Sequence, residues 1–144
     1  MRYADAMVDQ SAAIPYRLNG AGGVEVLLVT SKSRRRWILP KGRVPWNMRP
    51  QYSAAREALQ EGGVVGVASS VPVADYEQEK VELSGKVATV RVLAYPLEVT
   101  SVIQVWAEMH VRKRRWLSLK KAIAKVTDPQ LRRALKAFRK QQKC

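Results

Sequence analysis

Blocks of hydrophobic residues, separated by glycine, proline and charged segments, predict several strands and three helices in this chain. The β-branched run at residues 24–30 is typical of a central strand. Residues 12–18 predict an edge strand, because Pro15 lacks the N–H that a strand in the middle of a sheet needs. Residues 37–39 predict a short strand, and residues 42–50, with two prolines and no periodicity, predict a loop.

The first helix is predicted at residues 51–61, where apolar residues recur at helical spacing and Gly62 and Gly63 provide a stop. Ser118 and Asp128 are the expected N-caps of two late helices. The remaining elements are expected in this order: strands at 64–67, 71–81 and 86–97, a loop near 99–106, a last strand at 110–117, and helices at 118–126 and 129–142. This order predicts an α+β fold with a mixed β-sheet sandwiched between helices.

The chain length of 144 residues fits a single domain spanning residues 1–144. A hydrophobic fraction of 47% is enough for a core, and no run approaches the ~18 apolar residues of a membrane-spanning helix. We expect no secretory signal, because no apolar block follows a basic start. The only cysteine is Cys144, which leaves no intrachain disulfide or thiolate metal site and fits a reducing cytoplasm.

Positive charge is concentrated in the last quarter of the sequence. Lysine and arginine number 26 against 12 acidic residues, and residues 111–144 hold 13 of the basic residues with a single acid, Asp128. Such a field attracts polyanions, which include phosphorylated metabolites, nucleic acid and anionic lipid. The basic helical segment 118–144 is therefore interpreted either as a solvated face or as a surface that draws in a polyphosphorylated ligand or nucleic acid.

The predicted helix 51–61 carries a pair of carboxylates suited to a divalent cation. Glu57 and Glu61 are four residues apart, so both lie on one helix face, one turn apart. Mg²⁺ binds one or two protein carboxylates and takes further ligands from substrate phosphates. Basic residues that could hold those phosphates precede the helix: Arg34, Arg35, Arg36, Lys41 and Arg43. The alternative is a solvated, salt-bridged helix face with no ligand.

Residues 42–64 resemble the Nudix box of the Nudix (MutT-like) pyrophosphohydrolases, whose pattern is G-x5-E-x7-R-E-U-x-E-E-x-G-U with U a bulky aliphatic residue. The register has no gap, and five of the seven fixed letters match: Gly42, Arg56, Glu57, Glu61 and Gly63. Trp37-Ile38-Leu39-Pro40-Lys41-Gly42 before the box and Arg115-Trp116-Leu117-Ser118 before a late helix extend the resemblance over residues 12–126.

The resemblance implies roles for the box residues and a divalent cofactor, Mg²⁺ or Mn²⁺. Glu57 and Glu61 would bind the metal, and Arg56 would orient a glutamate through an ion pair. Gln60 stands where the family has another metal-binding glutamate, so it would offer a carbonyl oxygen without charge. Glu108, in the loop before the last strand, lies where some family members place an extra metal ligand or base.

Two further departures bear on the site. Met48 replaces the first glutamate of the box, and its soft sulfur does not suit a hard cation. Ala58 is small where the family has a large aliphatic residue. Gly42 and Trp46 are candidates for substrate contact beside the basic loop. His110, the sole histidine, is interpreted as a strand residue with a local hydrogen bond.

The resemblance implies hydrolysis of a phosphoanhydride in a polyphosphorylated substrate, closest to the subgroup acting on diphosphoinositol polyphosphates and dinucleoside polyphosphates. A nucleoside diphosphate linked to another moiety is a further substrate class of the family. The alternative is an impaired Nudix domain that binds polyphosphate or RNA as a sensor or adaptor, because Gln60 and Met48 replace box glutamates. The family includes monomers and dimers, so the oligomeric state stays open.

Overall fold

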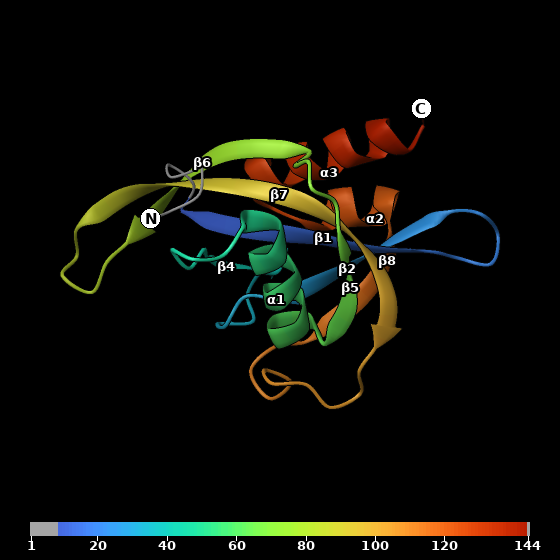
Figure 1. The fold of residues 1–144 in the computed structure, drawn as a ribbon, viewed down its shortest axis with the longest axis horizontal. Coiled ribbons are helices and arrows are strands. Elements are labelled where there is room, and N and C mark those ends of the chain that lie inside the picture. The colour runs from blue at the N-terminus through green and yellow to red at the C-terminus, as the bar shows by residue number, and fades with distance from the viewer. Residues whose placement is uncertain (1–8, 144) are drawn as a thin grey trace.

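The computed structural model describes residues 9–143, and Cys144 lies outside this described part. Eight strands and three helices follow one another along it, as Figure 1 shows. Their bounds are β1 (Gln10–Leu18), β2 (Val24–Thr30), β3 (Trp37–Ile38), β4 (Lys41–Arg43), α1 (Pro50–Gly62), β5 (Val64–Ala68), β6 (Ala74–Val81), β7 (Val87–Val102), β8 (Arg114–Ser118), α2 (Leu119–Lys125) and α3 (Pro129–Gln142).

The strands form one mixed sheet whose main order is β3-β2-β1-β7-β5, with β4 on β1, β6 on β7 and β8 on β2. β1 and β7 run parallel, and the other ladders are antiparallel. Helix α1 covers one face of the sheet, and α2 and α3 cover the other (Figure 1). The predicted α+β fold, a mixed sheet between helices, is therefore confirmed.

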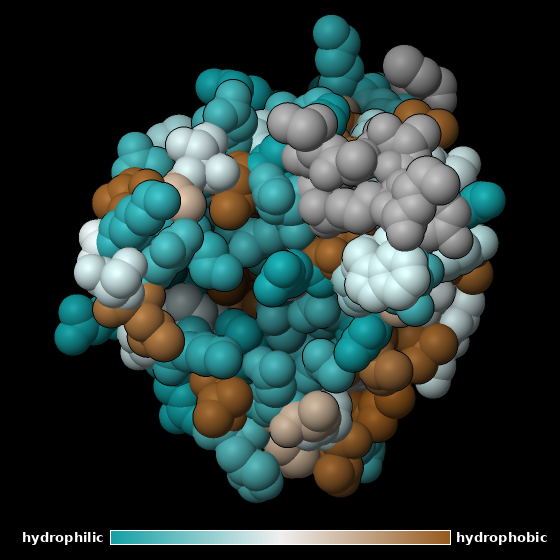
Figure 2. All heavy atoms as spheres, turned by 60° about the vertical axis from the view of Figure 1, so that its left-hand side comes forward, coloured by the Kyte–Doolittle hydropathy of each residue, from teal (hydrophilic) through white to brown (hydrophobic). Residues whose placement is uncertain are grey.

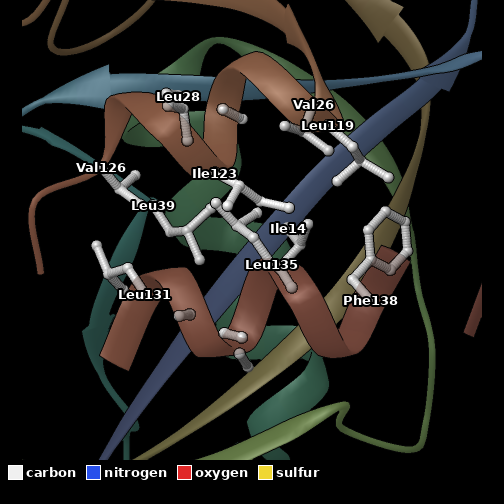
Figure 3. Close-up of a cluster of buried hydrophobic side chains, with 14 of the residues drawn as sticks. Ile14, Val26, Leu28, Leu39, Leu119, Ile123, Val126, Leu131, Leu135 and Phe138 are labelled. Carbon is white, nitrogen blue, oxygen red and sulfur yellow. The ribbon is translucent and has the colours of Figure 1, made fainter. Parts of the chain in front are cut away.

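Two cores lie on the two faces of the sheet. Alternate residues of β1 enter different cores, with Ile14 facing α2 and α3 and Ala13 facing α1. Figure 3 shows Ile14, Ile123 and Leu135 meeting where the sheet, α2 and α3 pack together. Burial on both faces explains why β2 reads as a continuous apolar run. Ala58, small in place of a large aliphatic residue, is fully buried in the core under α1.

Strand β1 is central, so the predicted edge position was wrong. Pro15 is tolerated because the strand changes partner beside it on one side. Residues 10–12 of β1 pair with β4, whereas residues 16–18 pair with β2. Pro15 lies between the two ladders, where its missing N–H interrupts neither.

Three element boundaries also differ from the sequence prediction. β4 overlaps the start of the predicted loop 42–50, β7 continues to Val102 into the predicted loop near 99–106, and β8 begins at Arg114. Each boundary depends on a partner distant in the sequence. β4 pairs with β1, the end of β7 pairs with β5, and β8 pairs with β2. The hydrophobic pattern of a short segment does not show which distant strand the segment will pair with.

The helices match the prediction closely because their ends are encoded locally. Gly63 terminates α1 with a positive φ of 65°, a conformation that glycine adopts without strain. The Ser118 and Asp128 side chains accept hydrogen bonds from Lys121 N and Gln130 N, as N-caps do. No helix within residues 9–143 has the length and apolar character that crossing a membrane requires.

Candidate metal and phosphate site

Helix α1 presents Glu57 and Glu61 toward strand β4. Glu57 is half-buried, and Glu61 is 6% exposed. Gly42 of β4 makes room for the Glu57 side chain, because a Cβ at Gly42 would lie 2.5 and 2.6 Å from the two carboxylate oxygens of Glu57. A side chain at position 42 would therefore force the Glu57 carboxylate to move from this position.

Glu61 is held from two sides. The backbone N–H of Lys41 donates a hydrogen bond to Glu61 Oε1 over 3.2 Å. A guanidinium nitrogen of Arg112 lies 3.3 Å from Glu61 Oε2. Strand β4 and the loop before β8 thus fix the orientation of this carboxylate, which is a requirement for a precise ligand.

Arg112 is the cation that sequence reasoning did not place at the site. Its side chain is 7% exposed, and all three guanidinium nitrogens are engaged. Besides the Glu61 contact, Nε donates to Glu108 Oε1 over 2.7 Å, and another nitrogen donates to the Thr30 carbonyl over 3.0 Å. Arg112 therefore belongs to the acidic site, whereas from the sequence alone it was only counted among the basic residues of the range 111–144.

The loop between β7 and β8 is fastened to the C-terminal turn of α1. The indole N–H of Trp106 donates to the Glu61 carbonyl over 3.1 Å, and Glu108 N donates to the Gln60 carbonyl over 3.2 Å. Arg114 stacks on the Trp106 ring at 3.9 Å and donates to the Gly63 carbonyl over 3.2 Å. These contacts bring Glu108 beside the box carboxylates.

Burial perturbs both box carboxylates. It raises the pKa of Glu61 to about 7, against the opposing influence of Arg112 and the Lys41 amide. Burial also raises the pKa of Glu57, with the charge of Arg56 opposing it and that of Glu108 adding to it. Two acids with raised pKa values on one helix face mark a position where a cation would restore charge balance.

The residues at this position fit a hard divalent cation bound partly by substrate. Within residues 9–143 no three His, Cys, Asp or Glu residues are grouped closely enough to hold a metal by themselves. Glu57 and Glu61 supply two carboxylates on one helix face, while Glu108 is bound to Arg112. One or two carboxylates, completed by phosphate oxygens and water, is the ligand set that Mg²⁺ prefers.

The other predicted box residues are placed differently. Arg56 is exposed, and among the described residues its side chain makes no ion pair or hydrogen bond. The Gln60 side chain is half-buried and likewise has no hydrogen-bond partner in the described part of the chain.

The predicted phosphate contacts divide into three groups. Arg34 donates to the His110 carbonyl, so it joins two loops, whereas Arg35 is exposed without a contact to another described side chain. Arg36, Lys41 and Arg43 line hollows on the far side of β4 from Glu57, as described below. Trp46 is 63% exposed in the loop after β4.

Two hollows lie on the side of β4 that faces α3. One, of about 330 Å³, includes Arg36 and Lys41, and the other, of about 290 Å³, includes Arg43 and Lys80. Lys41 and Arg43 are two residues apart in β4, so they project together, opposite to Gly42. On the side of the molecule that carries β4 and β6, Figure 2 shows a hollow among mainly hydrophilic side chains.

Lys41 connects the hollows to the carboxylates. Its main chain binds Glu61, and its side-chain Nζ donates to Gln78 Oε1. Gln78 Nε2 in turn donates to Asp128 Oδ2 over 2.8 Å. Burial lowers the pKa of Lys41, while Asp128 and Glu61 oppose that effect. A further hollow, of about 680 Å³ around Tyr76, contains no residue of α1 or β4.

Comparison with known families gives one match across most of the chain. The family model described as NUDIX domain matches residues 8–138. The chain is 32% identical over 148 residues to Nudix hydrolase 12, mitochondrial, of Arabidopsis thaliana, covering 89% of this chain and 70% of that protein. It is 30% identical to Nudix hydrolase 21, chloroplastic, of the same plant, covering 87% of this chain and 63% of that protein's length.

Two further comparisons concern proteins named for a substrate. The chain is 32% identical over 102 residues to diphosphoinositol polyphosphate phosphohydrolase 3-beta of Bos taurus, covering 69% of this chain and 58% of that protein. Its fold matches a crystal structure of a C. elegans Ap4A hydrolase binary complex with a TM-score of 0.69 and 22% identity, covering 94% and 98% of the two chains. At that identity the structural match establishes the fold.

Proposed function

The chain belongs to the Nudix family, and from that premise we propose that it is a divalent-cation-dependent hydrolase of a phosphoanhydride bond in a polyphosphorylated substrate. The observation that carries this proposal is the pair Glu57 and Glu61, one helical turn apart and both directed at β4. Gly42 leaves room for the Glu57 carboxylate, and the main-chain N–H of Lys41 orients the Glu61 carboxylate.

Glu57 and Glu61 are the proposed metal ligands, with Mg²⁺ or Mn²⁺ as the ion. A bound divalent cation would polarise the phosphoanhydride and make water a better nucleophile. Glu108 is the proposed additional acid, because its main chain is bound to Gln60 beside the box carboxylates. Arg56 and Gln60 make no side-chain hydrogen bond among the described residues, so the Arg56 guanidinium is available to substrate phosphate and the Gln60 amide to substrate or metal.

The hollows beyond β4 are the proposed site for the phosphate-rich part of the substrate. Lys41 and Arg43 line them from the opposite face of the strand whose Gly42 faces Glu57, so a substrate that contacts both the hollows and the carboxylates would have to pass around β4. Arg36 and Lys80 add donors for phosphate oxygens, and acidic residues line the same hollows, Glu79 and Asp128 in one and Asp9 and Glu82 in the other. Trp46, exposed in the same loop region, is a proposed stacking contact.

Diphosphoinositol polyphosphates and dinucleoside polyphosphates are the proposed substrate classes. The name of the Bos taurus relative contains the first class, and the name of the C. elegans hydrolase contains Ap4A, a member of the second class. Both classes carry several phosphates, for which the lysine and arginine side chains of the hollows are the proposed contacts. Phosphate release from a panel of the two classes, with and without Mg²⁺ or Mn²⁺, tests the proposal. Turnover that requires metal and is lost in Glu61→Gln, but kept in the exposed control Glu98→Gln, is the expected result.

A second candidate function, polyanion binding without turnover, is favoured by the outer surface of α2 and α3. Exposed basic residues on it include Lys120, Lys121, Lys125, Arg133, Lys136 and Lys140. Apart from the N-cap Asp128, no acidic residue lies in this part of the chain. If no substrate of the panel is hydrolysed and RNA binds with a steep salt dependence, this function replaces the hydrolase.

A further inference from the structure

The acidic site contains its own buried cation. Arg112 bridges Glu61 and Glu108 and also binds the Thr30 carbonyl, so no guanidinium nitrogen is left without a partner. Main-chain contacts fix it further, because Arg112 N donates to the Glu108 carbonyl over 3.0 Å and Lys113 N donates to Thr30 Oγ1 over 2.9 Å. The guanidinium is therefore a built component of the site and not a side chain that happens to lie near it.

The oxygens that Arg112 occupies are the ones a divalent cation needs. Of the two Glu61 oxygens, Oε1 accepts from the Lys41 amide and Oε2 faces Arg112. Glu108 Oε1 accepts from Arg112 at 2.7 Å, which is the short distance of a charge-assisted hydrogen bond. A cation that takes Glu61 and Glu108 as ligands would have to share or replace these contacts.

The charges at the site also indicate that Arg112 opposes the binding of a divalent cation. Arg112 pairs with both Glu61 and Glu108, and its charge offsets part of theirs without entry of an ion. A divalent cation that enters beside Arg112 meets a less negative site and a repelling positive charge. Removal of the guanidinium alone would leave the buried Glu61 and the partly buried Glu108 without their ion-pair partner, which is costly for the fold.

We propose that Arg112 is a resident counter-ion that competes with the divalent cation for Glu61 and Glu108, which stabilises the metal-free protein and weakens metal binding. This inference rests on the proposed function, because it assumes the box carboxylates as the metal position. Arg112 acts through the carboxylates, so it is a positioning residue. When a metal binds, Glu61 and Glu108 exchange the guanidinium for the ion, and Glu108 becomes available as a third carboxylate.

Direct Mn²⁺ titration followed by electron paramagnetic resonance of the free ion tests the proposal without relying on turnover. Arg112→Met should lower the Mn²⁺ dissociation constant by about tenfold or more, because the competing charge is gone. Arg112→Lys keeps the charge but loses the fork that spans both acids, so a smaller change is expected. Lys113→Met is the matched control, since this exposed neighbour loses the same charge without contact to the acids.

Thermal unfolding of the same variants supplies the second readout. Without metal, Arg112→Met should unfold at a lower temperature than the wild type. Saturating Mn²⁺ should raise the unfolding temperature of Arg112→Met by more than it raises that of the wild type. The double variant Arg112→Met with Glu108→Gln removes one charge of each sign and should recover part of the loss. If Arg112→Met is too unstable to purify, Arg112→Lys and the double variant still report the change in Mn²⁺ affinity.

The outcomes separate this inference from the proposed function. Mn²⁺ binding that is unchanged or weaker in Arg112→Met, in a wild type that binds Mn²⁺ and hydrolyses substrate, overturns the inference and leaves the function standing. Binding by Arg112→Met alone, with an inactive wild type that binds no Mn²⁺, supports the inference and overturns the function. Absence of Mn²⁺ binding in every variant overturns both.

Discussion

The carboxylate of Glu57 occupies the space that a Cβ atom at Gly42 would need, so the Glu57 side chain of α1 rests against strand β4 at its glycine. Gly42 is also paired with Ser11 of β1, which limits how far its backbone can move. This contact sets the position of one proposed metal ligand. It also explains in physical terms why the box begins with glycine.

Replacement of Gly42 by alanine should therefore displace Glu57. We expect Gly42→Ala to weaken Mn²⁺ binding and hydrolysis by at least about tenfold. Overpacking should lower the free energy of unfolding by about 1–3 kcal/mol. Gly20→Ala is the matched control, because a Cβ at Gly20 meets nothing within 4 Å. Equal activities of the two variants would contradict the role assigned to the Gly42–Glu57 contact.

The raised pKa of Glu61 predicts a pH dependence of the metal-free protein. Its pKa is about 7 in the folded chain, against an ordinary value of 4.5, so the native state holds a proton that the unfolded state releases. Stability from this group is full below pH 4.5 and is lost as pH rises through 7. The raised pKa of Glu57 acts in the same direction.

Urea unfolding at several pH values between 5 and 8, with metal removed by a chelator, measures this dependence. The free energy of unfolding of the wild type should fall across that interval. The free energy of unfolding of Glu61→Gln, whose side chain stays uncharged, should fall less steeply over the same interval. A wild type and a Glu61→Gln variant with parallel profiles would show that Glu61 ionises in the folded chain as it does in the unfolded chain.

Restoration of the family residue at position 60 is a further prediction. Gln60→Glu adds a carboxylate three residues from Glu57, and its side chain has no partner to lose among the described residues. We expect Mn²⁺ affinity to rise by about tenfold and metal-free stability to fall, because like charges are brought closer. Gln51→Glu adds the same charge at the opposite end of α1 and serves as control. No difference between the two would mean that position 60 faces away from the ion.

The proposed phosphate hollow predicts a separate effect on substrate binding. Lys41→Met removes the ammonium that faces Gln78 but keeps the main-chain N–H that binds Glu61. The Michaelis constant should rise by about tenfold with a smaller change in kcat, because the lost contact is made with bound substrate as well as with the transition state. Lys125→Met, on the exposed face of α2, should leave both constants unchanged if substrate occupies the hollow.

The local parts of the fold could be predicted from the sequence, and the pairings could not. The three helices were predicted with their caps because Gly63, Ser118 and Asp128 act within a few residues of the ends they terminate. Strand β1 was misplaced because the position of Pro15 between two ladders depends on β2 and β4. Partner choice across a sheet is not contained in the pattern of one segment.

In the site, too, the residues set by local spacing could be predicted, and those set by distant contacts could not. Glu57 and Glu61 could be identified because helical spacing alone puts them on one face. Arg112 was missed because it stands in a run of basic residues, and its burial depends on a loop folded over the end of α1. The spacing of four residues between Glu108 and Arg112 was the signal that could have indicated their ion pair.

A crystal structure with Mn²⁺ and a nonhydrolysable polyphosphate would decide whether Glu57 and Glu61 hold the metal, because manganese is located by its anomalous scattering. We expect a manganese ion bound by the Glu57 and Glu61 carboxylates and by phosphate oxygens, with the remaining phosphates beside Lys41 and Arg43. A polyphosphate bound without manganese, with Glu57 and Glu61 turned away from it, would show that these carboxylates are not the metal site.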